Sequence, residues 1–462
     1  MSKRFRLSGS MKNVAKISSG TVIGQAISIL TLPIITRIYG AEIMGVWTII
    51  VSMSNLMNTV TDLGLTQCIM ITPEEKLERN FAVLKWIARF LSVAGTLVVL
   101  LYCLLIAGYE TQTTILVSLF SFIYALTLQT CSMSYTYLNR QKNYSALMKN
   151  PMINYGTMAV CCITLGLLGF KKYGYYIGVT IGQLVMLAQM RRYLPRNRVK
   201  LTMADFKTVI SENLTFVKYQ MPTNIAYQAR EQLPNLLIGG LFGNTILGYF
   251  SISQKLLNIP VNFIGQALGR VFYQRLSELR LKGQSLAPFV QRNVLRAMKI
   301  AFIPMVALAA FGDAAIVMFF GAEYAIGGVV VRIVVFRSFL TFITASNQGM
   351  DIVLERQHYS LITCLSQTVM LCVSILVSFW LTETLDVCAI ARTVCFMAVQ
   401  TVYYCAIFRT LELPPLRFLK NMLISTGGVL LLSVLARYGF IALTRLTGWG
   451  ILEYLAGFLV EI

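Results

Sequence analysis

Apolar runs of about 20 residues recur along almost the whole chain, and this feature restricts the fold more than any other. A helix of that length crosses a hydrocarbon layer about 30 Å thick. Of the 462 residues, 56% are hydrophobic and only 13% are charged, which is far from the composition of a soluble protein. The chain is therefore predicted to be an all-α polytopic membrane protein.

The apolar runs predict between 12 and 14 membrane spans, arranged as two halves of six. The last of the fourteen candidates is short and contains Glu453. We predict an N-terminal six-helix lobe over 1–207, a second six-helix lobe over 208–410, and one or two extra helices over 411–462. The candidate spans are 15–39, 41–65, 83–107, 114–137, 151–170, 174–191, 214–241, 247–271, 297–319, 326–350, 359–381, 386–408, 419–441 and 447–460.

The basic residues between the spans predict the orientation of the chain. Most of the 40 Lys and Arg residues fall in connections on the same side as the N-terminus. The connections on the other side contain only Arg37, Lys171, Lys172 and Arg445. By the positive-inside rule the N-terminus is cytoplasmic. The net charge of +21 thus reflects mainly topology, and no nucleic-acid partner is predicted.

A short internal repeat supports the division into two similar halves. The segment Pro33 to Trp47 resembles Pro234 to Phe250. In both, an aromatic-Gly pair is followed five residues later by Gly-x-aromatic, at a spacing of 203 residues. The repeat predicts that each half begins with the same helical hairpin. Chance similarity of a glycine-containing turn is the alternative.

Basic residues inside the spans are the first functional signal, because each should cost roughly 2.5 kcal/mol or more in lipid. They outnumber the acids in the spans, which are Asp62, Glu231 and Asp313. A phosphate or pyrophosphate would complement this excess of positive charge. Residues near span ends, such as Lys218 and Arg437, have the alternative of extending to the interface. The set is Lys218, Arg230, Lys255, Arg332, Arg337, Arg392 and Arg437.

Polar residues at helical spacing are the second signal, because they place a polar face along several spans. Such faces should turn inward, either toward a water-filled cavity or into hydrogen bonds between helices. Four spans carry them: Asn55, Asn58 and Asp62; Gln220, Asn224, Gln228, Glu231 and Asn235; Gln254, Asn258, Asn262, Gln266 and Arg270; and Arg337, Thr341, Thr344, Gln348 and Asp351.

The buried carboxylates have two interpretations. Glu231 and Asp62 are candidates for proton or cation coupling, because a low-dielectric site raises a carboxylate pKa. Structural pairing with a cation is the alternative. Arg230 and Glu231 are adjacent and point about 100° apart on a helix, which predicts that their partners lie on other helices.

Signals for catalysis or a resident cofactor are weak. His358 is the single histidine, and the ten cysteines lack metal-ligand spacing. The sequence contains no Gly-rich phosphate loop or nucleophile elbow. We therefore expect neither an enzyme nor a bound cofactor.

Two stretches resemble a known family. TLPIITRIYGAEIMGVW, ending at Trp47, is similar to the opening hairpin of bacterial polysaccharide repeat-unit flippases of the Wzx type, which serve O-antigen and capsule synthesis. These belong to the multidrug/oligosaccharidyl-lipid/polysaccharide (MOP) superfamily. REQLPNLLIGGLFGNTILGYFSISQKLLNIPVNFIGQALGRVF, from Arg230 to Phe272, resembles the start of their second lobe. Weaker similarity extends over most of 1–410. Family members often have Asp-Arg where this chain has Arg230-Glu231.

The resemblance implies two six-helix lobes forming a central V-shaped cavity, and transport by alternating access in the bacterial cytoplasmic (inner) membrane. The implied cargo is an oligosaccharide linked to undecaprenyl pyrophosphate, moved with the help of a proton or sodium gradient and alongside other polysaccharide assembly proteins. We assign Glu231 and Asp62 to ion coupling. The head-group candidates are Arg230, Arg332, Arg337, Lys255, Arg392 and Arg37, and the sugar candidates are Asn55, Asn58, Asn224, Gln228, Asn258, Asn262 and Gln348.

Two other transport functions and one enzymatic function remain as alternatives. A flippase for the peptidoglycan precursor lipid II would suit the charge equally well. A multidrug or cation antiporter of the same superfamily should have an acidic cavity, which the excess of basic residues disfavours. A membrane glycosyltransferase would need a large external loop or a carboxylate-rich catalytic site, and neither is evident in the sequence.

Overall fold

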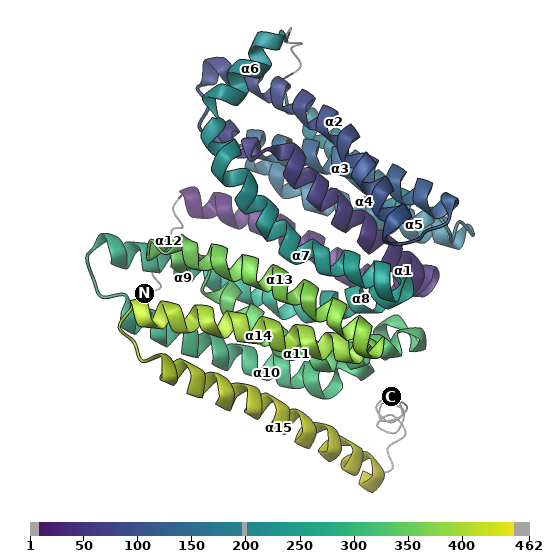
Figure 1. Cartoon of the computed structure of the whole chain (residues 1–462), viewed down its shortest axis with the longest axis vertical. Coiled ribbons are helices and arrows are strands. Elements are labelled where there is room, and N and C mark those ends of the chain that lie inside the picture. The colour runs from purple at the N-terminus through teal and green to yellow at the C-terminus, as the bar shows by residue number, and fades with distance from the viewer. Residues whose placement is uncertain (1–8, 196–200, 448–462) are drawn as a thin grey trace, which may run out of the picture. The chain divides into compact units, whose positions relative to one another are not determined.

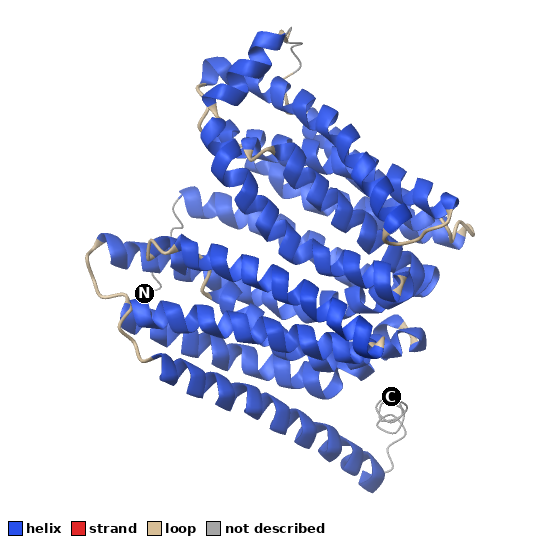
Figure 2. Cartoon of the chain, in the orientation of Figure 1, coloured by secondary structure: helices blue, strands red, loops and turns tan. Residues whose placement is uncertain are grey.

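The computed structural model describes residues 9–195 and 201–447, and this part of the chain is helical with no strands (Figures 1 and 2). Short loops or single turns separate most of the helices. The α-helices are α1 (Gly9–Asp62), α2 (Glu74–Leu105), α3 (Thr111–Arg140), α4 (Tyr144–Leu167), α5 (Gly174–Arg191), α6 (Met203–Glu212), α7 (Met221–Phe242), α8 (Asn244–Pro260), α9 (Gln266–Leu281), α10 (Ala287–Phe320), α11 (Ala325–Ser346), α12 (Met350–Val353), α13 (Gln357–Thr382), α14 (Leu385–Thr410) and α15 (Pro415–Thr447).

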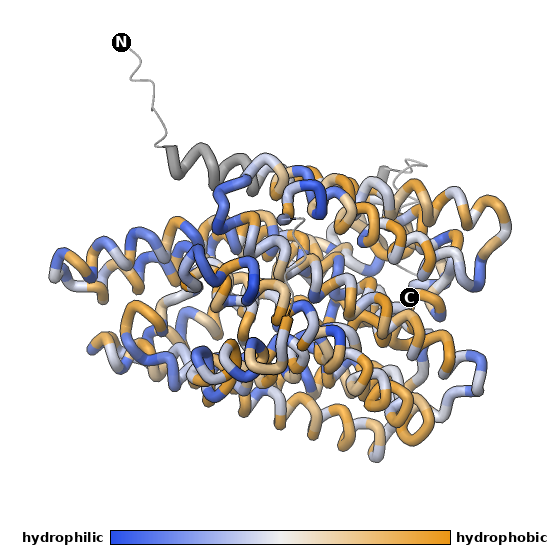
Figure 3. Tube along the Cα trace, turned by 90° about the horizontal axis from the view of Figure 1, so that it is seen from above, coloured by the Kyte–Doolittle hydropathy of each residue, from blue (hydrophilic) through white to orange (hydrophobic). Residues whose placement is uncertain are grey.

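Eight of the described helices are long and apolar enough to cross a membrane: Ser19–Asp62, Glu74–Leu105, Thr111–Arg140, Ala287–Phe320, Ala322–Ser346, Gln357–Thr382, Leu385–Thr410 and Pro415–Leu446. The predicted spans at 151–170, 174–191, 214–241 and 247–271 are also helical but fall outside this group. Hydrophobic residues occupy long stretches of most helices (Figure 3). The last candidate span, 447–460, lies outside the described residues. The predicted all-α membrane fold is confirmed.

The chain divides into two compact units, Met1–Leu241 and Phe242–Ile462. Unit 1 contains α1 to α7 and unit 2 contains α8 to α15. The division therefore places α7 with unit 1, whereas the repeat in the sequence starts a new half before it. Two hydrogen bonds hold α7 in unit 1: the Tyr102 hydroxyl donates to the Leu236 carbonyl at 2.7 Å, and Asn235 Nδ2 donates to Ser52 Oγ at 3.3 Å.

The repeated hairpin is visible in the backbone of both units. Gly40 has φ 76° and ψ 173°, and Gly243 has φ 90° and ψ 167°. These angles lie in a region that glycine enters at little cost and other residues avoid. The same glycine thus makes the same turn 203 residues apart, between the two helical segments of α1 and between α7 and α8.

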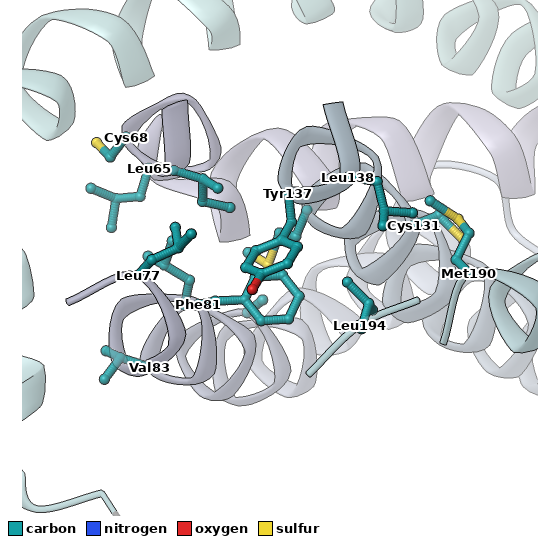
Figure 4. Close-up of a cluster of buried hydrophobic side chains, with 14 of the residues drawn as sticks. Leu65, Cys68, Leu77, Phe81, Val83, Cys131, Tyr137, Leu138, Met190 and Leu194 are labelled. Atoms are coloured by element: carbon teal, nitrogen blue, oxygen red, sulfur yellow. The ribbon is translucent and has the colours of Figure 1, made fainter. Parts of the chain in front are cut away.

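Unit 1 contains a hydrophobic cluster that joins α2, α3, α5 and the 3-10 turn Leu65–Met70 (Figure 4). The rings of Phe81 and Tyr137 lie 4.9 Å apart between centroids at its centre. The short helix α6 packs Phe206 and Val209 against the same cluster. Ion pairs Arg79–Asp205 at 3.2 Å and Lys76–Glu212 at 2.7 Å join α6 to α2 at the surface.

In unit 2, α11 packs against α8, α10 and α14, and α15 packs along α10 (Figure 1). Residues of α11 such as Val330, Val335 and Phe342 have no exposed surface. A π-helical segment, Val261–Gly265, follows Pro260 and makes α8 and α9 one continuous irregular helix. A second π segment, Phe216–Gln220, precedes α7. Wide turns of this kind are frequent at functional sites.

Candidate binding site and its charged residues

The continuous helix from α8 to α9 in unit 2 carries an exposed polar face. Its residues follow helical spacing and are all exposed: Lys255, Asn258, Asn262, Gln266 and Arg270. The opposite face packs inward through Ser253, Leu257 and Gly265. An exposed lysine and three amides within a span would be costly against lipid, which favours contact with water or a polar ligand.

Unit 1 has a less exposed polar face on α7. Asn224 and Gln228 are half-buried. Gln220 Nε2 donates to Asn224 Oδ1 at 2.9 Å, and Gln232 Nε2 donates to Gln228 Oε1 at 3.3 Å. The amides therefore form pairs along the helix, one turn apart, and each retains capacity for a further hydrogen bond.

Arg230 and Glu231 pair with each other, which corrects the expectation that their partners lie on other helices. Arg230 Nη2 lies 2.8 Å from Glu231 Oε1, and Nε donates to the same oxygen at 3.0 Å. The side chains start about 100° apart on the helix, but both are long enough to bend together at an accessible surface. The guanidinium also lies over the ring of Tyr227, 5.5 Å from its centroid.

Asp62 lies at the end of α1 and accepts hydrogen bonds from neutral groups. Gln129 Nε2 of α3 donates to it at 2.9 Å, and the Thr66 hydroxyl also donates. Within the described residues no cation forms an ion pair with Asp62. The half-buried Asn58 has an Oδ1 with no hydrogen-bond partner in the described part, while Asn55 is also half-buried. Arg37 is exposed on the preceding segment, one turn before Gly40.

Asp313 of α10 is the centre of a charged cluster inside unit 2. Its side chain has no exposed surface, and Arg437 of α15 donates to its Oδ2. Arg332 of α11 lies 3.8 Å from the same oxygen, with 42% of its side chain exposed. Arg437 therefore turns into the protein instead of extending to an interface. One buried carboxylate thus holds two of the predicted cations.

Two further arginines of unit 2 lie against aromatic rings. The Arg337 guanidinium is 4.9 Å from the centroid of Phe396, and that of Arg392 is 4.5 Å from Phe250. Such cation–π contacts stabilise desolvated arginine. Arg392 is only 4% exposed, so a ligand would reach it only if the helices around it separate. Gln348 is exposed just after α11, where the helix approaches Gly269 of α9 closely.

A buried amide network in unit 2 was absent from the sequence-based candidates. Gln367 Nε2 of α13 donates to Gln400 Oε1 of α14 at 2.9 Å, and Gln400 Nε2 donates to Thr344 Oγ1 of α11 at 3.0 Å. Gln367 is the only amide side chain in the predicted span 359–381, and Gln400 is the only one in 386–408, so neither forms a polar stripe. A single glutamine per span was the only signal, and it cannot identify its partner.

Features of a metal or redox centre are absent from the described chain. No group of three His, Cys, Asp or Glu residues is placed to hold a metal ion in 9–195 and 201–447. The ten cysteines, all within this part, are free thiols.

The model of a family described as "Polysaccharide biosynthesis protein" matches residues 34–326. No curated protein matches the sequence. Among solved structures, the lipid II flippase MurJ in an inward closed conformation is 12% identical, with a TM-score of 0.72 over 96% of this chain and 98% of that one. A MATE-family multidrug resistance transporter of the MOP superfamily, facing inward, is 14% identical, with a TM-score of 0.59 over 87% and 98%.

A third similar structure bears on the charged residues. It is a MOP superfamily transporter from Pyrococcus furiosus, described as having a binding pocket of reversed polarity that suggests a different function. It is 16% identical, with a TM-score of 0.52 over 87% of this chain and 96% of that one. These likenesses confirm the MOP fold predicted from the two hairpin motifs.

Proposed function

The chain belongs to the polysaccharide biosynthesis protein family, and from this premise we propose that it is a flippase for saccharides linked to a polyprenyl pyrophosphate. The proposed cargo is an undecaprenyl-pyrophosphate-linked oligosaccharide repeat unit for a surface polysaccharide such as O-antigen or capsule. Transport proceeds by alternating access across the bacterial cytoplasmic membrane, with the N-terminus on the cytoplasmic side.

The observation that carries the proposal is the exposed polar face of α8 and α9. A pyrophosphate-linked sugar needs both a cation and groups that hydrogen-bond to hydroxyls. Lys255 supplies the cation, and Asn258 and Asn262 supply amides that donate and accept. The polyprenyl tail needs no polar surface and stays in the bilayer.

The other candidate residues divide by accessibility. Arg37 and Arg332 are exposed enough to meet a head group directly, and Arg230 is partly exposed beside Glu231. Arg337 and Arg392 contribute positive potential from within unit 2. Asn55, Asn58, Asn224, Gln228 and Gln348 are proposed to contact sugar hydroxyls.

Asp62 and Glu231 are proposed to sense the proton or sodium ion that drives the cycle. The hydrogen-bond donors to Asp62 among the described residues are all neutral. A bound proton or sodium ion would therefore balance its negative charge. Glu231 already holds Arg230, which makes it the weaker candidate of the two.

One second candidate function is favoured by a specific observation. The fold matches a lipid II flippase over 96% of this chain. Lipid II also carries its sugars on a polyprenyl pyrophosphate, so the same cations would suit it. The two functions differ only in the sugar that the amides recognise.

Transport of a labelled lipid-linked oligosaccharide in reconstituted vesicles tests the proposal. We compare the parent with Lys255→Gln and Arg230→Gln, and use Lys420→Gln, an exposed lysine on α15, as a matched control. Loss of a charge-assisted contact of about 1.5–3 kcal/mol should slow transport about tenfold or more in the first two variants. Lys420→Gln should transport at the parental rate.

Three outcomes would count against the proposal. Normal transport by both Lys255→Gln and Arg230→Gln would remove the role of the cations. Failure of the parent with every polyprenyl-linked sugar would remove the flippase function. Preference for lipid II over the repeat-unit substrates would assign the chain to the second candidate.

A further inference from the structure

A cavity of 190 Å³ lies inside unit 2, between α9, α10 and the end of α11. It is separate from the polar face of α8 and α9, whose five residues do not line it. Its lining combines basic, polar and apolar groups, among them Arg275, Arg296, Asn293, Ser346, Val271 and Phe272. No part of the proposed transport function uses this cavity.

The polar part of the lining is suited to an anion. Ser346 is 4% exposed, and its hydroxyl has no hydrogen-bond partner within the described chain. Asn293 and Arg296 are three residues apart on α10 and so share one face of that helix. Arg296 is exposed and makes no ion pair with another described residue. A buried hydroxyl without a partner is costly, which points to a ligand group beside it.

Arg275 supplies a second guanidinium from α9. Its Nη1 donates to Glu278 Oε2 at 2.8 Å, and Gln274 Nε2 donates to Glu278 Oε1 at 3.2 Å. The hydrogen bond from Arg275 is the main reason that the pKa of Glu278 is lowered. The guanidinium of Arg275 has five N–H groups in a fork. One of them donates to Glu278, and the others remain able to bind another anion.

The apolar part of the lining offers a surface to the apolar atoms of a lipid. The rings of Phe272 and Phe289 stack at 5.5 Å between centroids, with an angle of 7° between their planes. Val271 is 69% exposed beside them. A free phosphate ion would gain nothing from these side chains, whereas the glycerol and first acyl carbons of a lipid would bury apolar surface against them.

The charge around the cavity favours an anionic lipid over a zwitterionic one. The segment 270–299 carries Arg270, Arg275, Arg280, Lys282, Arg292, Arg296 and Lys299, and Glu278 is its only acidic residue. By the positive-inside rule this segment is cytoplasmic, where anionic lipids attract each nearby basic residue by about 1 kcal/mol.

We propose that this cavity binds the phosphate group of an anionic membrane phospholipid. Arg275 and Arg296 hold the phosphate oxygens, Asn293 and the Ser346 hydroxyl donate from within, and the glycerol backbone lies against Phe272 and Val271. The bound lipid fixes the end of the α9–α10 hairpin against α11.

Thermal unfolding of the full-length protein in detergent tests this site, with dioctanoyl phosphatidylglycerol as the probe. Dioctanoyl phosphatidylcholine and inorganic phosphate are measured in parallel. The test variant is Arg275→Gln with Arg296→Gln. The matched control is Arg292→Gln with Lys299→Gln, which removes two exposed charges from the same helix hairpin without touching the lining. Arg275→Lys with Arg296→Lys keeps the charge but loses the forked donors.

Phosphatidylglycerol should raise the melting temperature of the parent and of the control at the same half-saturating concentration. The Gln variant should need at least tenfold more lipid, and the Lys variant an intermediate amount. Equal binding by the parent and the Gln variant, or equal loss in the control, would overturn the site. Inorganic phosphate or phosphatidylcholine acting at the same concentration as phosphatidylglycerol would overturn the assignment to an anionic lipid.

Should the Gln variant unfold before lipid is added, the Lys variant decides the result. Native mass spectrometry of the purified parent and Lys variant then counts retained phosphatidylglycerol. Full retention by the Lys variant would contradict the role of the forked donors and overturn the proposed contact.

Discussion

The two units begin with the same glycine turn but treat their buried charges differently. In unit 1, Asp62 is held by a glutamine and a threonine, and Arg230 is neutralised by its neighbour Glu231. In unit 2, the fully buried Asp313 is held by Arg437 and lies beside Arg332, while Arg337 and Arg392 rest on aromatic rings. Most of the basic residues inside the predicted spans therefore belong to unit 2.

A repeated scaffold thus constrains the backbone more strongly than it constrains the side chains. The turn at Gly40 and Gly243 depends on a backbone conformation that few residues other than glycine tolerate. The charges depend only on which partners the neighbouring helices supply. One unit can thus acquire a basic interior without any change in its helical hairpins.

Replacing the buried carboxylate of each unit should give the largest difference in stability between the two units. Asp313→Asn leaves Arg437 buried without its counter-charge, and we expect a loss of about 3–5 kcal/mol in the free energy of unfolding. Asp62→Asn keeps an acceptor for Gln129 and Thr66, and should cost about 1 kcal/mol. Denaturant unfolding in detergent measures both, and equal losses would contradict the difference in how the two carboxylates are held.

A double variant identifies the cause of the larger loss. Asp313→Leu combined with Arg437→Leu removes both charges, and should recover much of the stability that Asp313→Asn loses. A double variant as unstable as Asp313→Asn would mean that packing, and not the buried charge, dominates at this position.

Replacing the turn glycine by alanine should lower the stability of the two units by similar amounts. Gly243→Ala forces alanine to a φ of about 90° and should cost about 1–2 kcal/mol. A Cβ there meets nothing within 4 Å, so the cost is one of backbone conformation alone. Gly40→Ala should cost a similar amount. As a control, Gly439→Ala in α15 also meets open space and has no positive φ, so it should stabilise by about 0.5–1 kcal/mol. A harmless Gly243→Ala would contradict the shared turn.

The neutral buried networks should show the smallest difference. Gln400 makes two side-chain hydrogen bonds in unit 2, whereas Gln183 in unit 1 accepts one from the Thr127 hydroxyl at 2.7 Å. Hydrogen bonds between membrane helices are worth about 0.6 kcal/mol each. Gln400→Leu should therefore cost about 1 kcal/mol and Gln183→Leu about half of that. Double-mutant cycles with Gln367→Leu and Thr127→Val isolate the bonds, and coupling near zero in both would show that packing alone holds these helices.

Much of the fold followed from residue type and spacing. Apolar runs predicted helices because a lipid-spanning segment must satisfy its own backbone, and thirteen of the candidate spans are helical in the described chain. The glycine pair predicted the repeated turn for a steric reason that is local to one residue. The division after Leu241 was not visible in the sequence, because contacts between distant segments set it, among them the hydrogen bonds that join α7 to α1 and α2.

The candidate site was predictable in its residue types but not in its pairings. The sequence identified Asn258, Asn262, Gln266 and Arg270 as one face, because helical periodicity is local. It placed Gln254 at the start of this face, whereas in the structure Gln254 is half-buried and Lys255 is exposed beside Asn258. It was wrong about Arg230 and Glu231, because the reach of two long side chains outweighs the 100° between their positions.

Residue types and their spacing were enough to predict a helical membrane protein with a repeated hairpin and more basic than acidic residues in its spans. These properties depend on hydrophobicity, chain stereochemistry and composition. All three are local, so they can be read from residues that are neighbours in the sequence. The packing of helices in three dimensions brings Arg437 to Asp313 and Gln367 to Gln400, and it leaves Lys255 exposed. A charge or an amide in an apolar span requires a partner, but helix packing between distant segments selects which one it finds.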